Sequence, residues 1–255
     1  MIRKISGAIG LRTNEEQHPY PIMKQLPEIS FPTPQNRDRR RGFSLLELMT
    51  VVSIMAALAA ISFPGIRAAM TNAQMAQGTA NIRSIAQGLR AWAADNEGVF
   101  PVEESFHGEE IVSANDAFRE LVPEYIDNEK IFALARSARG PKADNRIDER
   151  DEILEPGENH YAYVAGLHDT SRSNWPLVVD GTDGSGYYVQ QRGSKGGAWE
   201  GNKALVAYIG GNAEAVRLRG EDDRRYLPRE GYPEENALAV EYMGNHVELL
   251  EAEDE

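Results

Sequence analysis

The chain has 255 residues, no cysteine and a formal net charge of −13 at pH 7. Without cysteine it has neither disulfide bonds nor thiolate metal ligands, and cysteine-based catalysis is excluded. Residues 1–42 hold eight Lys or Arg and four Asp or Glu, a net charge of +4 that leaves −17 for the remainder. So acidic a remainder disfavours binding to nucleic acid or to anionic lipid surfaces.

The first expected unit is a basic leader over residues 1–42. Two stretches, 18–21 and 27–34, are rich in proline and lack periodicity, so we expect no fold there. The leader ends in the sequence RDRRRG over residues 37–42. Such a basic cluster keeps the N-terminal side of a membrane span in the cytoplasm, which would place everything after the span outside.

A continuous apolar run follows the leader. Residues 43–63 read FSLLELMTVVSIMAALAAISF, in which Glu47 is the only ionisable residue. A membrane-spanning helix needs about 20 such residues. A charged carboxylate in hydrocarbon costs about 2.5–3.5 kcal/mol on insertion scales, so acids in membrane segments are usually paired and functional. The alternative interpretation is a buried helix of a soluble protein with a stray acid.

The order of basic leader, Gly42, Phe43 and an apolar run with Glu47 at its fifth position resembles the class III signal of type IV pilins and type II secretion pseudopilins. The resemblance covers Gly42–Pro64 almost residue for residue. It implies that a prepilin peptidase cuts between Gly42 and Phe43 and methylates the new amine of Phe43. It also implies that Glu47 pairs with the N-terminal amine of a neighbouring subunit. That pairing is physically reasonable, because a lone acid and a lone amine are each costly in hydrocarbon.

A leader of 42 residues is long for this family. Met23 is therefore a second candidate for the true start, which would shorten the leader.

The helix is expected to continue beyond the membrane as an amphipathic segment over residues 65–97. Pro64 and Gly65 should kink or loosen it without necessarily ending it. Ile82, Ile85 and Leu89 are spaced so that they share one helical face with Trp92, which predicts a core stripe that packs on a sheet. Gly98 is the expected helix end.

Residues 98–255 are expected to form one outward α+β head. Residues 114–126 are typical of a short amphipathic helix that ends before Pro123, and the highly charged residues 136–159 are typical of an exposed loop. Short β-rich runs separated by Gly, Asp and Asn predict an antiparallel sheet. The expected strands are residues 161–164, 176–179, 187–189, 204–209 and 213–218, whereas residues 237–242 are ambiguous. The expected fold is thus pilin-like, with a long N-terminal helix packed on a C-terminal antiparallel sheet.

Two further elements resemble major pseudopilins. One is the turn Gly98-Val99-Phe100-Pro101 at the end of the helix, and the other is Leu121-Val122-Pro123-Glu124-Tyr125. In that family these elements connect the helix to the sheet.

Two groups of residues could carry chemistry. Asp180 and Asp183 lie on the glycine-rich stretch DGTDGSG, whose oxygens suit calcium, and major pseudopilins often bind calcium in a loop of this sheet. The alternative is a plain Asp-Gly turn. The second group is His160 and His168-Asp169 with Ser171 or Ser173 nearby, from which a hydrolase triad could be built. No Gly-x-Ser-x-Gly or His-Glu-x-x-His motif accompanies these residues, so we expect no enzyme.

The sequence therefore predicts a structural subunit of a type II secretion pseudopilus in the inner membrane, with its head in the periplasm. The expected partners are prepilin peptidase, copies of the chain itself, minor pseudopilins, the inner-membrane assembly platform and membrane lipid. The alternatives are a type IV pilus subunit for adhesion, motility or DNA uptake, and an anchored extracytoplasmic binding protein or enzyme that never polymerises.

Overall fold

The structure, a computed structural model, describes residues 42–102, 108, 110–244 and 246–254. The leader predictions, including the choice between Met1 and Met23, lie outside these residues except at Gly42. The chain divides between Val52 and Ser53 into two units.

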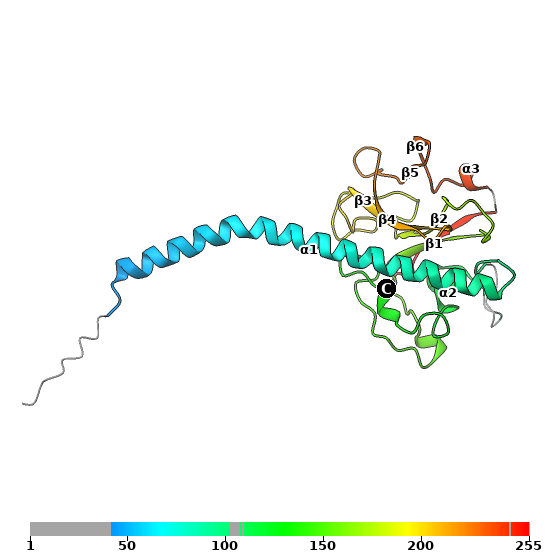
Figure 1. The fold of residues 1–255 in the computed structure, drawn as a ribbon, viewed down its shortest axis with the longest axis horizontal. Coiled ribbons are helices and arrows are strands. Elements are labelled where there is room, and N and C mark those ends of the chain that lie inside the picture. The colour runs from blue at the N-terminus through cyan, green and yellow to red at the C-terminus, as the bar shows by residue number, and fades with distance from the viewer. Residues whose placement is uncertain (1–41, 103–107, 109, 245, 255) are drawn as a thin grey trace, which may run out of the picture. The chain divides into compact units, whose positions relative to one another are not determined.

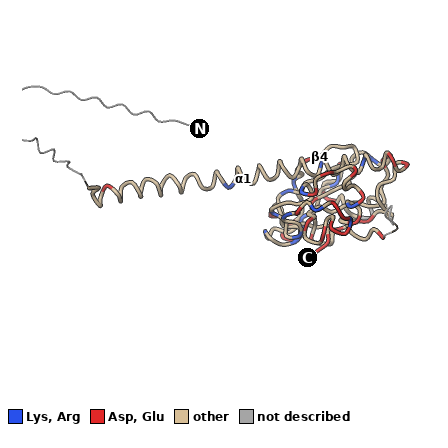
Figure 2. The backbone as a smooth tube through the Cα atoms, turned by 90° about the horizontal axis from the view of Figure 1, so that it is seen from below, with Lys and Arg blue, Asp and Glu red and all other residues tan. Residues whose placement is uncertain are grey.

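The dominant element is helix α1, Leu45–Asp95, which has 51 residues (Figure 1). It begins two residues after the expected start at Phe43 and ends one residue before Asn96. Pro64 lies inside it, so the helix continues past this proline as predicted. Among the described residues α1 is the one helix long and apolar enough to cross a membrane, and none of its apolar window is buried. Figure 2 shows that the N-terminal part of α1 carries few charged residues, whereas the head carries many.

The C-terminal half of α1 packs on the sheet. Ile82, Ile85 and Leu89 are fully buried, and Trp92 is partly buried against the same core. The approach is close at Gly78, where a Cβ atom would lie 2.5 Å from Cδ1 of Leu205 on the sheet. The predicted core stripe and its packing on a sheet are therefore confirmed.

The main sheet has five antiparallel strands in the order β4-β3-β2-β1-β7. Four of them match predicted strands within one residue or so at each end. They are β1 Tyr161–Ala165, β2 Pro176–Asp180, β3 Lys203–Tyr208 and β4 Ala213–Arg217. Strand β7, Glu248–Leu250, was not predicted and pairs with β1 through Leu249 opposite Val164. The predicted α+β, pilin-like fold is confirmed.

The expected strand 187–189 is wrong. Tyr188 makes a single antiparallel bridge with Arg225 and no ladder. Its ring is buried and its hydroxyl donates to the carbonyl of Asp180 at 3.3 Å. The apolar pattern at this point therefore marks the anchor of a loop. A two-stranded sheet, β5 Pro228–Arg229 and β6 Tyr232–Asn236, was also missed, and the ambiguous residues 237–242 lead into the short helix α3, Val240–Met243.

The helix that was predicted to start at Ala114 and to end before Pro123 is shorter than expected. Helix α2 spans Ala114–Arg119, and Ser113 and Asp116 close its N-terminus in a capping box. Two single turns of 3₁₀ helix follow, η1 at Glu129–Phe132 and η2 at Arg150–Glu152.

Residues 136–159 are largely irregular, as expected, and the acids Asp144, Asp148, Glu149 and Asp151 are exposed as predicted, but other parts of the segment are buried. Ile153 and Leu154 belong to the core, and Arg136 and Arg139 are buried. The two arginines can be buried because each guanidinium has carboxylate and carbonyl partners within the head.

Candidate functional site

The site with the clearest chemistry is the start of α1. The backbone N–H of Glu47 donates to Oγ of Ser44 at 3.4 Å, and the N–H of Leu48 donates to the Ser44 carbonyl at 3.1 Å. Ser44 thus occupies the capping position before the first turn. Glu47 lies in that turn, where the helix dipole favours a negative charge. Phe43 precedes the helix and is 80 % exposed.

The polar side chains of this segment differ in whether they have a hydrogen-bond partner within the helix. The hydroxyl of Thr50 donates to the Leu46 carbonyl at 2.6 Å, and that of Ser62 donates to the Leu58 carbonyl at 2.8 Å. Such hydroxyls are satisfied within the helix itself. By contrast, no residue described in the structure pairs with the Glu47 carboxylate. Glu47 is thus the group in residues 43–63 that needs a partner from elsewhere once water is removed.

The apolar side chains next to Glu47 are exposed, and so are those further along α1. Leu46, Leu48 and Met49 are each more than half exposed, as are Ile54, Met55 and Leu58. Exposed apolar surface of this extent marks contact with a membrane or with other proteins.

The comparisons with known proteins agree with this geometry. Residues 37–63 match the family model described as the prokaryotic N-terminal methylation motif. The chain carries a pilin-like N-terminal methylation motif. The matched residues contain Gly42, Phe43 and Glu47. Comparison with curated proteins gave no match, and neither did comparison with solved structures.

The methylation motif bears on the general role of the chain. It implies processing by prepilin peptidase and polymerisation with copies of the chain itself, as in pilin-like subunits. The long apolar part of α1 fits a single-pass membrane anchor. The type of fibre does not follow from the motif, and the individual roles of Gly42, Phe43 and Glu47 stay predictions.

In the head, the predicted metal ligand Asp180 is buried, with 1 % of its surface exposed. One carboxylate oxygen lies 2.8 Å from Nε2 of His160. The other accepts hydrogen bonds from Nε1 of Trp199 at 2.7 Å and from the N–H of Leu205 at 2.6 Å. Burial, followed by the charge of Asp180, raises the pKa of Tyr161 well above its ordinary value. Asp180 is therefore a hydrogen-bond acceptor at the centre of the head.

The second predicted ligand, Asp183, is exposed on the following loop. Its Oδ1 accepts hydrogen bonds from the N–H and hydroxyl of Ser185, at 2.8 and 2.7 Å, and from the N–H of Tyr187 at 3.2 Å. These bonds make an Asp turn of the kind weighed as the alternative. Calcium binding by this pair stays a prediction.

His160 joins Asp180 to a serine. Its Nδ1 lies 2.9 Å from Oγ of Ser137, so a Ser137–His160–Asp180 chain of hydrogen bonds runs through the head. The order is that of a hydrolase triad, yet Ser137 Oγ also accepts hydrogen bonds from the N–H groups of Arg139 and Gly140. The cavity beside it measures about 10 Å³, which is no larger than a single water site. This geometry supports a structural role for the three residues.

The other residues considered for a triad form a separate surface group. Nδ1 of His168 lies 2.8 Å from Oδ1 of Asp169, and the N–H of His168 donates to the hydroxyl of Ser171. Both His168 and Asp169 are more than two-fifths exposed, and His160 contacts neither of them through a hydrogen bond.

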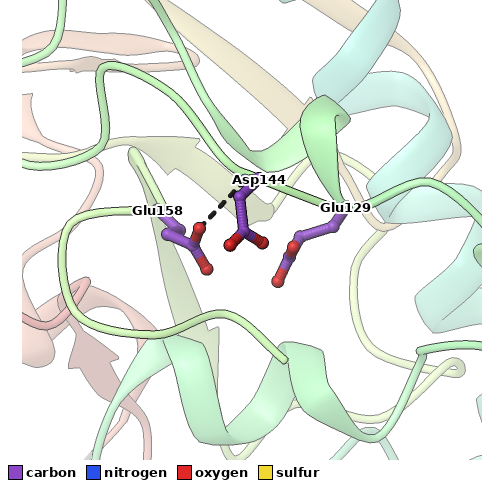
Figure 3. A group of neighbouring side chains, drawn as sticks. All are labelled: Glu129, Asp144 and Glu158. Atoms are coloured by element: carbon purple, nitrogen blue, oxygen red, sulfur yellow. Dashed lines mark hydrogen bonds between the residues drawn. The ribbon is translucent and has the colours of Figure 1, made fainter. Parts of the chain in front are cut away.

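One group of three acids in the described part of the chain brings its oxygens close together. Carboxylate oxygens of Glu129, Asp144 and Glu158 lie within 4.8 Å of one another (Figure 3). Glu129 is fully buried, and its two oxygens accept the N–H groups of Leu154 and Asn145. Burial is the main cause that raises the pKa of Glu129, and the nearby charges of Glu158 and Asp144 add to it. Both Glu129 oxygens already accept backbone hydrogen bonds. The side chain of Glu129 therefore links η1 to the loop that contains Asn145 and Leu154.

Sequence reasoning missed most of the head's polar framework. Ser137 and Arg139 lie in one loop, Trp199 and Glu251 come from two other segments, and none of the four carries a motif. The only available signal was chemical, because an acid such as Asp180 directly after a buried apolar strand must find donors.

Proposed function

We propose that the chain is a structural subunit of a type II secretion pseudopilus. The observation that carries the proposal is the exposed apolar surface of α1, in which Glu47 is the one ionisable residue and lacks a partner among the described residues. The matched methylation motif supports cleavage between Gly42 and Phe43 and methylation of Phe43. In the mature chain, the positive amine of Phe43 would lie at the end of an apolar segment, residues 43–63, that holds one negative side chain, Glu47.

Assembly would follow from that pair of charges. A carboxylate in hydrocarbon is costly alone, and so is an amine, whereas a contact between them relieves both costs. When the Glu47 of one copy meets the Phe43 amine of another, the contact joins two different surfaces, and such head-to-tail contacts build open helical fibres.

The proposed arrangement along the chain is a cleaved leader over residues 1–42, a membrane and assembly helix over 43–64, its amphipathic continuation over 65–97 and an outward head over 98–255. The basic cluster at residues 37–41 supports a cytoplasmic leader and a periplasmic head. The partners proposed for this arrangement are prepilin peptidase, minor pseudopilins and the inner-membrane assembly platform.

The pseudopilus is preferred over a type IV pilus because of two elements at the end of α1. The hydroxyl of Tyr163 donates to the Pro101 carbonyl at 2.9 Å, and the hydroxyl of Tyr125 donates to Asp95 at 3.0 Å. The Gly98–Pro101 turn and the Leu121–Tyr125 element therefore tie the helix end to the head, as their resemblance to major pseudopilins implies. The alternative is a subunit of a type IV pilus for adhesion, motility or DNA uptake.

Processing is tested by mass spectrometry of the N-terminus in cells with and without prepilin peptidase. The proposal expects a mature chain that begins with N-methylphenylalanine at position 43, and only the uncut precursor when the peptidase is missing or Gly42 is replaced in Gly42→Asp. Gly65→Ala, a change in the same helix, should be cut normally. Maturation at another position would contradict the proposal.

The choice of machine is tested in a strain that lacks the gene. A pseudopilus subunit predicts that exported proteins accumulate in the periplasm while surface pili, twitching and DNA uptake persist. The opposite result, normal secretion with loss of pili, would favour the type IV pilus. Normal behaviour in both assays would instead favour an anchored protein that does not polymerise.

A further inference from the structure

The stretch Asp180–Gly186 was expected to hold calcium, and its donor set can be tested against that ion. Calcium takes six to eight oxygen ligands, most of them from carboxylates, carbonyls and water. Both oxygens of Asp180 face nitrogen donors in the interior, from His160, Trp199 and Leu205. Oδ1 of Asp183 is turned back onto its own loop. Both oxygens of Asp180 are thus taken by internal donors, and Asp183 alone falls far short of six ligands, so the residues present do not fit calcium.

A positive group nevertheless lies against this loop. The guanidinium of Arg139 is buried, with 6 % of its side chain exposed. Its Nη1 donates to the carbonyl of Thr182 at 2.8 Å and to Oε2 of Glu251 at 2.5 Å, and its Nε donates to Oδ1 of Asp254 at 3.1 Å. One side chain therefore contacts both the glycine-rich loop and the C-terminal tail.

The loop and the tail are also joined directly around this guanidinium. The backbone N–H of Thr182 donates to Oε2 of Glu251 at 3.1 Å, and the Thr182 hydroxyl donates to Oε1 of the same residue. Lys195 pairs with Asp254 at the rim. The hydrogen bond from Lys195, with a contribution from Arg139, lowers the pKa of Asp254 below its ordinary value.

We propose that Arg139 is the built-in cation of this loop, which fixes the tail, residues 251–254, to the Asp180–Gly186 stretch without a divalent ion. The tail is strongly acidic and the loop is acidic too, so their contact needs a positive charge between them. A guanidinium suits this position because it stays charged at all relevant pH values and its planar fork can serve a carbonyl and two carboxylates together. This inference is independent of the type of fibre.

The physical consequence is a head whose tail contact does not respond to calcium. Because the cation is covalently part of the chain, chelators cannot remove it. Removing the guanidinium would leave the largely buried Glu251 without its cationic partner, with only the N–H and hydroxyl of Thr182 as donors. Breaking such a buried pair is strongly destabilising. Lysine at position 139 would keep the charge but lose the fork, and so should restore the contact only in part.

The experiment uses the full-length chain in detergent and has two measurements. The first is the melting temperature of the head, followed by tryptophan fluorescence, in millimolar calcium and in EDTA. The second is the rate at which carboxypeptidase releases the C-terminal residues. The variants are Arg139→Met and Arg139→Lys, and the control is Arg146→Met, which removes an arginine that is about half exposed in the same region.

We expect the wild-type melting temperature to be the same in calcium and in EDTA. Arg139→Met should melt at a lower temperature and release its tail at least several-fold faster, with Arg139→Lys in between and Arg146→Met close to wild type. If Arg139→Met does not fold, Glu251→Gln, compared with the exposed control Glu248→Gln, should give the same faster release. A wild-type melting temperature that rises with calcium would overturn the proposal, and so would tail release that is unchanged in both Arg139→Met and Glu251→Gln.

Discussion

The indole N–H of Trp199 lies 2.7 Å from Oδ2 of Asp180, in an interior where both residues are at least 95 % buried. Trp199 comes from the turn before β3, whereas Asp180 is the last residue of β2. The N–H of Leu205 donates to the same oxygen, so one carboxylate holds together the ends of two strands. His160, directly before β1, binds the other oxygen and extends the link to a third strand.

This relationship predicts that Asp180→Asn destabilises the head. The amide would turn an NH₂ group toward donors that need an acceptor, and an unsatisfied buried polar group costs about 1–3 kcal/mol. Asp180→Ala removes the acceptor of all these donors, and should lower the free energy of unfolding by roughly 3–5 kcal/mol. Denaturant unfolding followed by tryptophan fluorescence measures both changes.

Asp183→Asn is the matched control for this position, because it retains the Oδ1 atom that accepts the loop hydrogen bonds. Its effect should stay within about 0.5 kcal/mol. Equal effects of the two Asn substitutions would contradict the role given to Asp180.

The second prediction concerns the acids in Figure 3. Because the pKa of Glu129 is raised in the folded chain, its ionisation opposes folding. Its contribution to stability is therefore greatest below the ordinary pKa of 4.5 and falls as the pH rises through the folded value. Asp144→Asn keeps the Oδ1 that accepts the Arg146 N–H but removes one of the repelling charges.

Asp144→Asn should accordingly stabilise the head at pH 7 by up to about 1 kcal/mol, the scale of partly exposed charge interactions. The gain should shrink toward pH 4, where Glu129 is protonated in both proteins. Unfolding curves at several pH values, with the exposed Asp127→Asn as control, measure this difference. A gain that does not depend on pH would show that repulsion of Glu129 is not its cause.

The third prediction compares two glycines with the same backbone conformation. Gly98 has φ of +83° and Gly193 has φ of +82°, a region that favours glycine. A Cβ atom at Gly98 would lie 2.5 Å from Cε1 of His168, whereas nothing lies within 4 Å of one at Gly193. Gly193→Ala should thus cost about 1 kcal/mol for conformation alone.

Gly98→Ala should cost clearly more than Gly193→Ala, because His168 and Asp169 must also move. The comparison of the two melting temperatures isolates the steric part. Equal losses would indicate that the turn after α1 yields easily and does not fix the helix end to the head.

The parts of the fold that could be predicted are those with a local cause. The apolar run at residues 43–63, the core spacing of Ile82, Ile85 and Leu89, and the β-rich runs that became β1 to β4 all depend on periodicity and composition. The N-terminal methylation motif was recognisable for the same reason, since its residues are adjacent in the chain.

The parts that could not be predicted depend on distant contacts. Tyr188 looked like a strand residue because burial of a ring in a loop leaves the same apolar signal as burial in a sheet. The burial of Arg139 within the charged loop was not predicted, because its partner Glu251 lies 112 positions away in the sequence. Similarly, strand β7 is only three residues long and is defined by its pairing with β1.

The central claim is that Glu47 drives assembly and not anchoring. Its most direct test is the substitution Glu47→Gln, which keeps the size of the side chain and removes its charge, with Ser62→Ala as a control in the same helix. Membrane fractionation and N-terminal mass spectrometry report insertion and processing, and fibres sheared from cells that overproduce the chain report assembly. We predict that Glu47→Gln is inserted and processed like wild type but forms at least about tenfold fewer fibres, the ratio that a loss of 1.4 kcal/mol produces. Wild-type fibre yield from Glu47→Gln, with insertion unchanged, would contradict the account.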